Sequence, residues 1–171
     1  MKTLNKKICL LGDFAVGKTS LVERFVYNRF SSKYISTMGV RVSSKTIIVP
    51  HEANLIELKI MLWDLASSEI PRQIRTNYLR GLSGAILIAD LSRPETADSL
   101  TDYLEQVLQV NATAQLAFVA NKVDLFSAPP SVPAKFTQLA TEQEAPYYLT
   151  SNKTGAEVDT LFRQLGNVLV S

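Results

Sequence analysis

Cysteine and histidine are almost absent from this sequence, with one residue of each among 171. The single cysteine, Cys9, excludes an internal disulfide and indicates a reducing compartment. With only Cys9 and His51, the chain has no cysteine–histidine cluster for zinc, and a lone histidine argues against a Ser-His-Asp triad. We expect Cys9 to be an unreactive core thiol and His51 to be solvated in a turn.

Long hydrophobic runs are absent too, since no apolar run is long enough to cross a bilayer. The first run, Ile8 to Leu11, is too short for the core of a signal peptide. Myristoylation needs a glycine after Met1, and prenylation needs a cysteine near the end of the chain, where Leu169-Val170-Ser171 has none. We therefore expect a cytoplasmic protein with no direct lipid anchor.

The sequence also lacks an excess of one charge, low-complexity segments and internal repeats. Its formal net charge is +2, which is too small to indicate nucleic-acid binding. Hydrophobic residues make up 46% and charged residues 20%, values typical of a folded globular protein. The length suits one domain, residues 1–171, which we expect to be monomeric.

Short apolar runs alternate with segments of helical periodicity, which is the pattern of an α/β fold. The turn-rich residues 50–54 predict an antiparallel hairpin, and Ser92 with Glu95 predicts a capping box. We expect a six-stranded, mostly parallel sheet with one antiparallel edge strand, flanked by helices on both faces. The predicted strands cover residues 8–11, 40–49, 56–63, 85–90, 116–121 and 147–149. The predicted helices cover residues 19–27, 92–110, 134–144 and 157–169.

Residues 12–19 match the pattern G-x-x-x-x-G-K-[ST] between a predicted strand and a predicted helix. The glycines let backbone N–H groups point at phosphate oxygens, and the helix adds the positive end of its dipole. Lys18 is placed to bind the β and γ phosphates and Thr19 to ligate Mg²⁺. The motif predicts a P-loop that binds a nucleoside triphosphate; the alternative is a chance glycine-rich turn. The predicted contacts are Asp13, Phe14, Ala15, Val16, Gly17, Lys18, Thr19 and Ser20.

The segment Asn121-Lys122-Val123-Asp124 follows a predicted strand. The Asp124 carboxylate there can accept hydrogen bonds from N1–H and the exocyclic amine of guanine, a pair that adenine does not present. The Lys122 stem can lie against the plane of the base. Alone this is a weak pattern, for which a strand-to-helix turn is the alternative. The phosphate loop upstream makes it specific and predicts a guanine nucleotide.

With these two motifs the chain resembles the Ras superfamily of small GTPases, and within it the Rab-like branch, from Lys6 to about Leu169. The resemblance implies a P-loop NTPase fold that binds GTP or GDP with Mg²⁺. Residues 34–40 resemble the first switch segment, where Thr37 would bind Mg²⁺ and the γ-phosphate and Tyr34 would lie at the nucleotide. Phe30 would lie across the guanine.

By the same resemblance, Trp63-Asp64 begins the second switch segment and Asp64 would hold Mg²⁺ through water. Residues 150–153 are similar to the last base-contacting loop, where the N–H of Asn152 would meet the guanine oxygen between Ser151 and Lys153. The family has alanine where this chain has Asn152. Taken singly, each of these residues has a plainer alternative: Phe30 as a core residue, Thr37 as an ordinary surface threonine, and Asp64 as the cap of a turn.

Three further positions depart from the family pattern. Ser67 replaces a glycine whose N–H bonds the γ-phosphate, and Ser68 replaces the glutamine that orients the attacking water. Phe14 occupies a position for a small residue, where a ring would crowd an arginine finger. We assign catalysis to Lys18, Thr37 and Ser68, and predict weak hydrolysis that is insensitive to an arginine-finger activator. The alternative is that Glu69 or Gln73 orients the water.

Three functions fit these motifs. The first is a switch that hydrolyses GTP slowly and signals to protein effectors or regulators through its two switch segments. The second is a pseudo-GTPase module with negligible hydrolysis, and the third is a P-loop kinase or ATPase, against which residues 121–124 argue. Basic residues near the switch segments form either a solvated face or a docking surface for an acidic partner. They are Arg29, Lys33, Arg41, Lys45, Arg72, Arg75 and Arg80.

Overall fold

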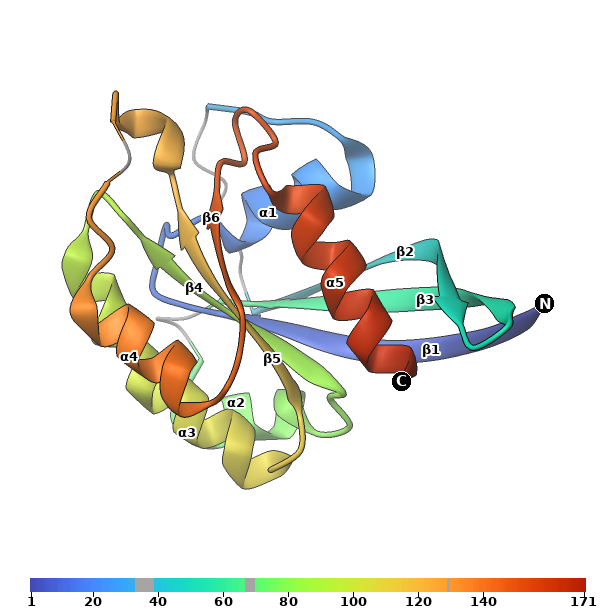
Figure 1. Ribbon diagram of the computed structural model, residues 1–171. Helices are drawn as coiled ribbons and strands as arrows, with labels where there is room; N and C mark the ends of the chain where they lie inside the picture. The colour runs from blue at the N-terminus through green and yellow to red at the C-terminus, as the bar shows by residue number, and fades with distance from the viewer. Residues whose placement is uncertain (33–38, 67–69, 129) are drawn as a thin grey trace.

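The computed structural model describes residues 1–32, 39–66, 70–128 and 130–171. Its six strands form one sheet in the order β2-β3-β1-β4-β5-β6, in which β2 runs antiparallel at one edge and the other pairings are parallel (Figure 1). This confirms the predicted α/β architecture. The strands are β1 Lys2–Leu11, β2 Val40–His51, β3 Asn54–Leu65, β4 Gly84–Asp90, β5 Gln115–Asn121 and β6 Tyr147–Thr150.

Helices cover both faces of the sheet (Figure 1). One hydrophobic cluster joins α1 and α5 to one face, and a second joins α2, α3 and α4 to the other. In the central strand β4 every residue is buried, as expected for a strand covered on both sides. The helices are α1 Lys18–Tyr27, α2 Arg72–Leu79, α3 Leu100–Val110, α4 Ala134–Glu142 and α5 Val158–Val170, with short 3₁₀ turns at Pro94–Ala97 and Val123–Leu125.

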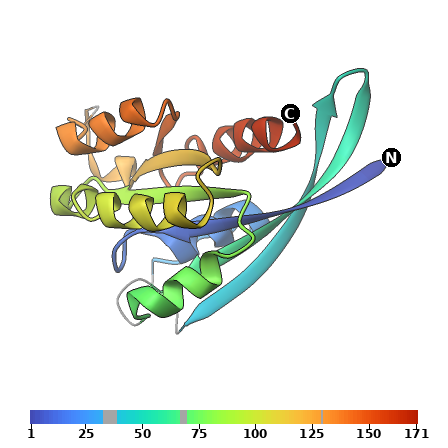
Figure 2. The same cartoon turned by 90° about the horizontal axis from the view of Figure 1, so that it is seen from below.

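The first strand is longer than predicted. It begins at Lys2, and it pairs with β3 along almost its whole length, from Lys2 beside Ile56 to Leu10 beside Asp64. Figure 2 shows β1 and the β2–β3 hairpin extending together beyond the body of the domain. The extension comes from long-range pairing, so the apolar run of residues 8–11 marks only its buried half.

The predicted helix over residues 92–110 is divided into a 3₁₀ turn, Pro94–Ala97, and α3, which begins at Leu100. The predicted capping box is wrong, because the Ser92 hydroxyl donates to Asp90 Oδ1 at 2.6 Å instead of capping a helix. A buried carboxylate two residues earlier therefore takes the hydroxyl that the pattern assigned to the helix.

Cys9 is fully buried in β1, and burial raises the pKa of its thiol to about 12, although Lys7 nearby opposes the shift. The thiol therefore stays protonated at neutral pH, as predicted for a core cysteine. Within the described parts of the chain, no helix has both the length and the hydropathy that a membrane crossing requires.

Candidate nucleotide-binding site

The carboxyl ends of the parallel strands bring the predicted motifs to one edge of the sheet. Asp90 at the end of β4 lies beside Asn121 at the end of β5, and Asn121 lies beside Thr150 at the end of β6. The phosphate loop follows β1 at the same edge and leads into α1 at Lys18. Segments more than a hundred residues apart thus surround one loop.

Two glycines give the phosphate loop its shape. A Cβ on Gly12 would lie 2.4 Å from the Ile88 carbonyl oxygen, and a Cβ on Gly17 would lie 2.3 Å from Asn121 Nδ2. Gly17 also has a φ of +111°, which favours glycine. Ala15 adopts a left-handed conformation as well, with a φ of +59°, which the motif did not predict. The loop therefore depends on close approach of backbone to its neighbours.

Lys18 lies inside this loop and is only 7% exposed. Its Nζ donates to the carbonyl oxygens of Gly12 at 2.8 Å and Asp13 at 2.9 Å. Burial lowers the pKa of Lys18 to about 8, although the carboxylates of Asp64 and Asp13 oppose the shift. A phosphate group in the loop would give this desolvated ammonium the counter-charge that favours its protonated form.

Thr19 and Asp64 meet beside the loop, where the Thr19 hydroxyl donates to Asp64 Oδ2 at 2.5 Å. Both side chains are buried, and Asp64 stands next to the end of β3. A hydroxyl and a carboxylate oxygen at this spacing are the hard ligands that Mg²⁺ prefers. Mg²⁺ commonly binds through one or two protein oxygens together with substrate phosphates and waters, so this small donor set fits the ion.

The base-reading segment is attached to the phosphate loop. Asn121 Nδ2 donates to the Val16 carbonyl at 2.9 Å, and Asn121 Oδ1 accepts from the Thr150 hydroxyl at 3.0 Å. The Asp124 side chain is exposed, and its Oδ1 accepts from the Ser151 hydroxyl at 2.7 Å. Ser151 thus fixes the orientation of the carboxylate and leaves it facing solvent, where a base can approach.

The predicted last base-contacting loop, residues 150–153, is held by a residue that the motifs did not reveal. Arg24 of α1 donates from Nε to the Asn152 carbonyl at 2.7 Å and from Nη2 to the Lys153 carbonyl at 2.5 Å. The Asn152 side chain donates from Nδ2 to the Gly17 carbonyl at 3.0 Å. No motif in the sequence marks Arg24 for this contact.

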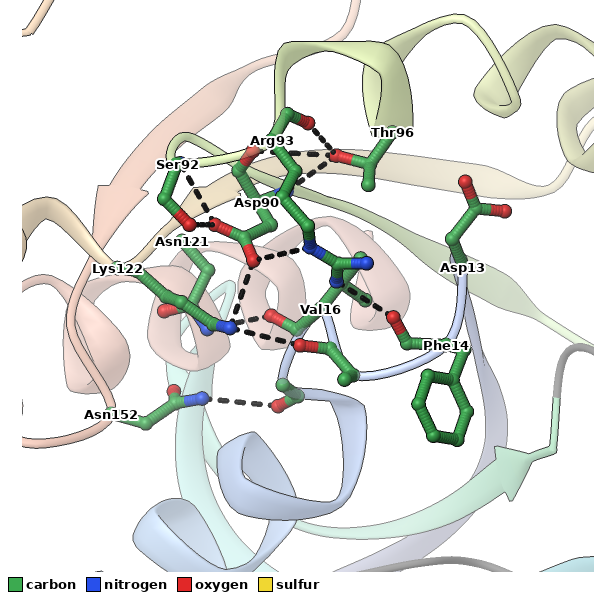
Figure 3. A network of polar contacts seen from close by, with 12 residues as sticks. Asp13, Phe14, Val16, Asp90, Ser92, Arg93, Thr96, Asn121, Lys122 and Asn152 are labelled. Carbon is green, nitrogen blue, oxygen red and sulfur yellow. Dashed lines mark hydrogen bonds and ion pairs between the residues drawn. The ribbon is translucent and has the colours of Figure 1, made fainter. Parts of the chain in front are cut away.

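A second unpredicted group is Asp90, which is 1% exposed. Its Oδ2 lies 2.8 Å from Lys122 Nζ and 3.0 Å from Arg93 Nε, and its Oδ1 accepts two hydrogen bonds from Ser92 (Figure 3). Burial raises the pKa of Asp90, but hydrogen bonds from Lys122, Ser92 and Arg93 outweigh that effect and hold it below its ordinary value. Asp90 is therefore a buried, charged anchor beside the phosphate loop.

Asp13 connects the phosphate loop to α3. Ser99 Oγ donates to its Oδ2 at 2.6 Å and Tyr103 Oη to its Oδ1 at 3.2 Å. The Arg75 guanidinium of α2 lies over the Tyr103 ring at 4.7 Å from its centroid. α2, which follows the predicted second switch segment, is thus in contact with α3, which holds the phosphate loop through Asp13.

Some residues named in the sequence analysis lie outside the described residues. They are Lys33, Tyr34, Thr37, Ser67, Ser68 and Glu69.

Two aromatic residues named for the site are at the surface. Phe14 is 51% exposed and Phe30 is 39% exposed, so neither is a core residue. Phe30 lines a surface pocket of about 360 Å³ together with Ser20, next to the start of α1. Both rings are therefore accessible to solvent.

Most of the basic residues near the switch segments have partners inside the protein. Glu23, which is buried, accepts from Arg29 Nε and Arg41 Nη2, each at 2.5 Å. Lys45 donates to the Phe25 carbonyl, while Arg72 and Arg75 pair with Asp102. Two carboxylates thus face four guanidinium groups, so these contacts orient the basic side chains and offset only part of the positive charge available to an acidic partner.

The fold and the site define a class: a P-loop domain whose base-reading segment is that of guanine-nucleotide-binding proteins. The model of the Ras family matches residues 7–170. The chain is 31% identical over 164 residues to the Ras-related protein SEC4 of Candida albicans, covering 95% of this chain and 76% of SEC4.

Other relatives agree. The chain is 29% identical over 160 residues to the Ras-related protein Rab-13 of Rattus norvegicus, covering 93% of this chain and 77% of Rab-13. It is 32% identical over 158 residues to the Ras-related protein RABA4d of Arabidopsis thaliana, covering 91% of this chain and 69% of RABA4d. The chain belongs to the Ras family and is a Rab-like small GTPase.

Proposed function

We propose that this protein is a guanine-nucleotide switch that binds GTP or GDP together with Mg²⁺ and hydrolyses GTP slowly. The observation that supports this most strongly is the convergence of three parts at one sheet edge. They are the buried Lys18 in its loop, the Thr19–Asp64 oxygen pair, and the Asp124 carboxylate held by Ser151. Each part has the chemistry for a different portion of one ligand.

Guanine recognition rests on Asp124. Its Oδ1 is occupied by the Ser151 hydroxyl along one direction, and a carboxylate has several further lone pairs for the N1–H and exocyclic amine of guanine. Adenine would leave those acceptors facing an acceptor nitrogen. The pairing therefore favours guanine over adenine, because a bound adenine would cover the carboxylate without giving it a donor, and an unpaired covered polar group is costly.

Phosphate binding rests on the loop and Lys18. Gly17 is in a left-handed conformation directly before α1, and a turn of this kind lets backbone N–H groups of the loop face a phosphate together with the start of the helix. The Lys18 ammonium supplies charge at the β and γ phosphates. A bound Mg²⁺ would supply positive charge to the same phosphates, with Thr19 as direct ligand and Asp64 acting through water.

We expect slow hydrolysis because three positions carry residues other than those that the family has there. The Ser68 hydroxyl is shorter than a glutamine amide and cannot donate and accept on one attacking water in the same way. The Phe14 side chain stands half-exposed on the loop, where it would obstruct an arginine supplied by a partner. Ser67 carries a Cβ where the family has glycine. Lys18 and Thr37 remain to stabilise the charge on the transferred group.

A switch also needs partners. We propose that effectors or regulators bind through the segments around Thr37 and Ser67, and that the protein is a cytoplasmic monomer. The competing proposal is a pseudo-GTPase, in which the same three substitutions abolish hydrolysis and the nucleotide is a long-lived ligand.

The experiment that tests the proposal is identification of the nucleotide that co-purifies with the protein, followed by GTP and ATP binding with and without Mg²⁺. We expect GTP or GDP to co-purify, GTP to bind far more tightly than ATP, and EDTA to accelerate nucleotide release. Equal binding of ATP and GTP would contradict the role of Asp124 and favour a kinase or ATPase.

A further inference from the structure

Four consecutive carbonyl groups of the phosphate loop each accept a hydrogen bond from a different side chain (Figure 3). Arg93 Nη2 donates to Phe14 at 2.7 Å, Lys122 Nζ to Ala15 at 2.9 Å, Asn121 Nδ2 to Val16 at 2.9 Å, and Asn152 Nδ2 to Gly17 at 3.0 Å. The two preceding carbonyls accept from Lys18. Every carbonyl from Gly12 to Gly17 is thus engaged by a side-chain donor, the first two by Lys18 and the other four by residues from outside the loop.

The carbonyl and N–H of one peptide unit point in opposite directions, because the unit is planar and trans. Each donor that holds a carbonyl outward therefore turns an N–H group inward, toward the place of the phosphates. A loop held in this way loses little conformational freedom when a ligand binds, and preorganisation of this kind strengthens binding.

Only two of the four donors belong to the base-reading motif. Asn121 and Lys122 are in that motif, whereas Arg93 lies after β4 and Asn152 stands where the family has alanine, which has no side-chain donor. We propose that Arg93 and Asn152 are positioning residues that fix the phosphate loop and slow nucleotide release. This inference rests on the proposed nucleotide-binding function.

Arg93 is itself held in place by a buried group. Its Nε donates to Asp90 Oδ2 at 3.0 Å, which leaves Nη2 directed at the Phe14 carbonyl. Lys122 bonds the same Asp90 oxygen and reaches the next carbonyl, that of Ala15. One buried carboxylate therefore aligns two cations with two neighbouring peptide units. The planar, forked guanidinium suits this double contact.

Asn152 is held from the other side. Arg24 bonds its backbone carbonyl, and its side-chain amide lies so close to the loop that a Cβ on Gly17 would be 2.9 Å from Nδ2. The side chain is 4% exposed, and its Oδ1 has no hydrogen-bond partner in the described part of the chain. The orientation of the amide is therefore set by the Gly17 carbonyl, and alanine or aspartate would remove that donor.

The test is the dissociation rate of a fluorescent GDP analogue in the presence of Mg²⁺. The variants are Asn152→Ala, the shape-matched Asn152→Asp, Arg93→Ala and the Arg93→Ala/Asn152→Ala double variant. Arg163→Ala on the exposed face of α5 is the control. We expect Asn152→Ala and Arg93→Ala each to accelerate release about 2- to 10-fold, the equivalent of one net hydrogen bond, and Asn152→Asp to accelerate it at least as much, because its carboxylate also repels the Gly17 carbonyl. The double variant should show about the product of the two effects, and Arg163→Ala should match the wild type.

A second readout separates positioning of the phosphate loop from general loosening of the base loop. Release of GDP and GTP should accelerate by the same factor, because the loop binds the phosphates that they share. The preference for GDP over IDP, which lacks the exocyclic amine, should stay unchanged because Asp124 and Ser151 are untouched. Loss of that preference would overturn the inference, since it would show a disturbed base site.

The outcomes distinguish the inference from the proposed function. If the wild-type protein binds no guanine nucleotide, the proposed function is wrong and the inference falls with it. If the wild type binds GDP but Asn152→Asp and Arg93→Ala release it at the wild-type rate, only the inference is overturned. Wild-type release from one of the two variants overturns the assignment of that residue.

Discussion

Replacing Asp90 with asparagine tests the buried anchor of the site. The substitution keeps the shape and the acceptor for Ser92, but places an amide between the cations of Arg93 and Lys122. Removing one partner of a buried ion pair costs about 3–5 kcal/mol. The two cations here are 36% and 33% exposed, so water screens them partly, and we expect a loss of about 2–3 kcal/mol.

The assay is urea unfolding at neutral pH, with Asp98→Asn as the control, because Asp98 is an exposed aspartate on the same connection. The pH dependence has a definite sign. The pKa of Asp90 lies below its ordinary 3.8 in the folded protein, so its contribution is present above that pH and is lost as the pH falls through the folded value. The unfolding free energies of the wild-type protein and of Asp90→Asn should therefore converge in acid. Equal unfolding free energies of Asp90→Asn and Asp98→Asn at neutral pH would refute the anchor.

Three further changes have defined outcomes. Gly17→Ala should abolish measurable nucleotide binding, a loss of at least about 100-fold, because its Cβ would lie 2.3 Å from the Asn121 amide at a φ that disfavours alanine; binding within a few-fold of wild type would contradict this. Glu23→Gln should lower the urea midpoint at neutral pH and make the unfolding free energy depend less on pH in acid. The hydrogen bonds from Arg29 and Arg41 hold the pKa of Glu23 below its ordinary 4.5, so its contribution to stability is lost as the pH falls through the folded value. An unchanged dependence of stability on pH in acid would contradict this. Asp124→Asn should weaken GTP binding about 100-fold or more while improving XTP binding, since an amide can donate to the second carbonyl of xanthine; retained preference for GTP over XTP would be inconsistent with the assigned base reader.

The sequence predicted the parts of the fold that depend on local patterns. The buried run of residues 116–121 and the turn at residues 50–54 carry their signals in adjacent residues, and both elements appear in the structure. The polar half of β1 carries no such signal, because Lys2 and its neighbours are ordered only by pairing with β3. The capping box at Ser92 failed since a stronger acceptor, Asp90, lies within reach of the hydroxyl.

The site divides in the same way. Lys18, Thr19 and Asn121 were predicted because their motifs have fixed spacing and a chemical reason for each residue type. Arg93 and Arg24 were missed because their contacts join segments far apart in the chain and involve backbone carbonyls, which any residue supplies. A side chain that bonds a distant carbonyl leaves no sequence pattern. Such donors become visible only when the strands bring the loops together.

The central claim is that this protein is a guanine-nucleotide switch with weak intrinsic hydrolysis. It is tested most directly by single-turnover hydrolysis of bound GTP by the wild-type protein with Mg²⁺. The measurement is made with and without an added activating protein that supplies an arginine finger to Rab-like GTPases. We predict a rate constant below about 3–5 × 10⁻⁴ s⁻¹, the intrinsic rate of Ras, and no acceleration by the activator. A faster unassisted rate, or a large acceleration by the activator, would contradict the account and direct attention to Glu69 or Gln73 as the group that orients the water.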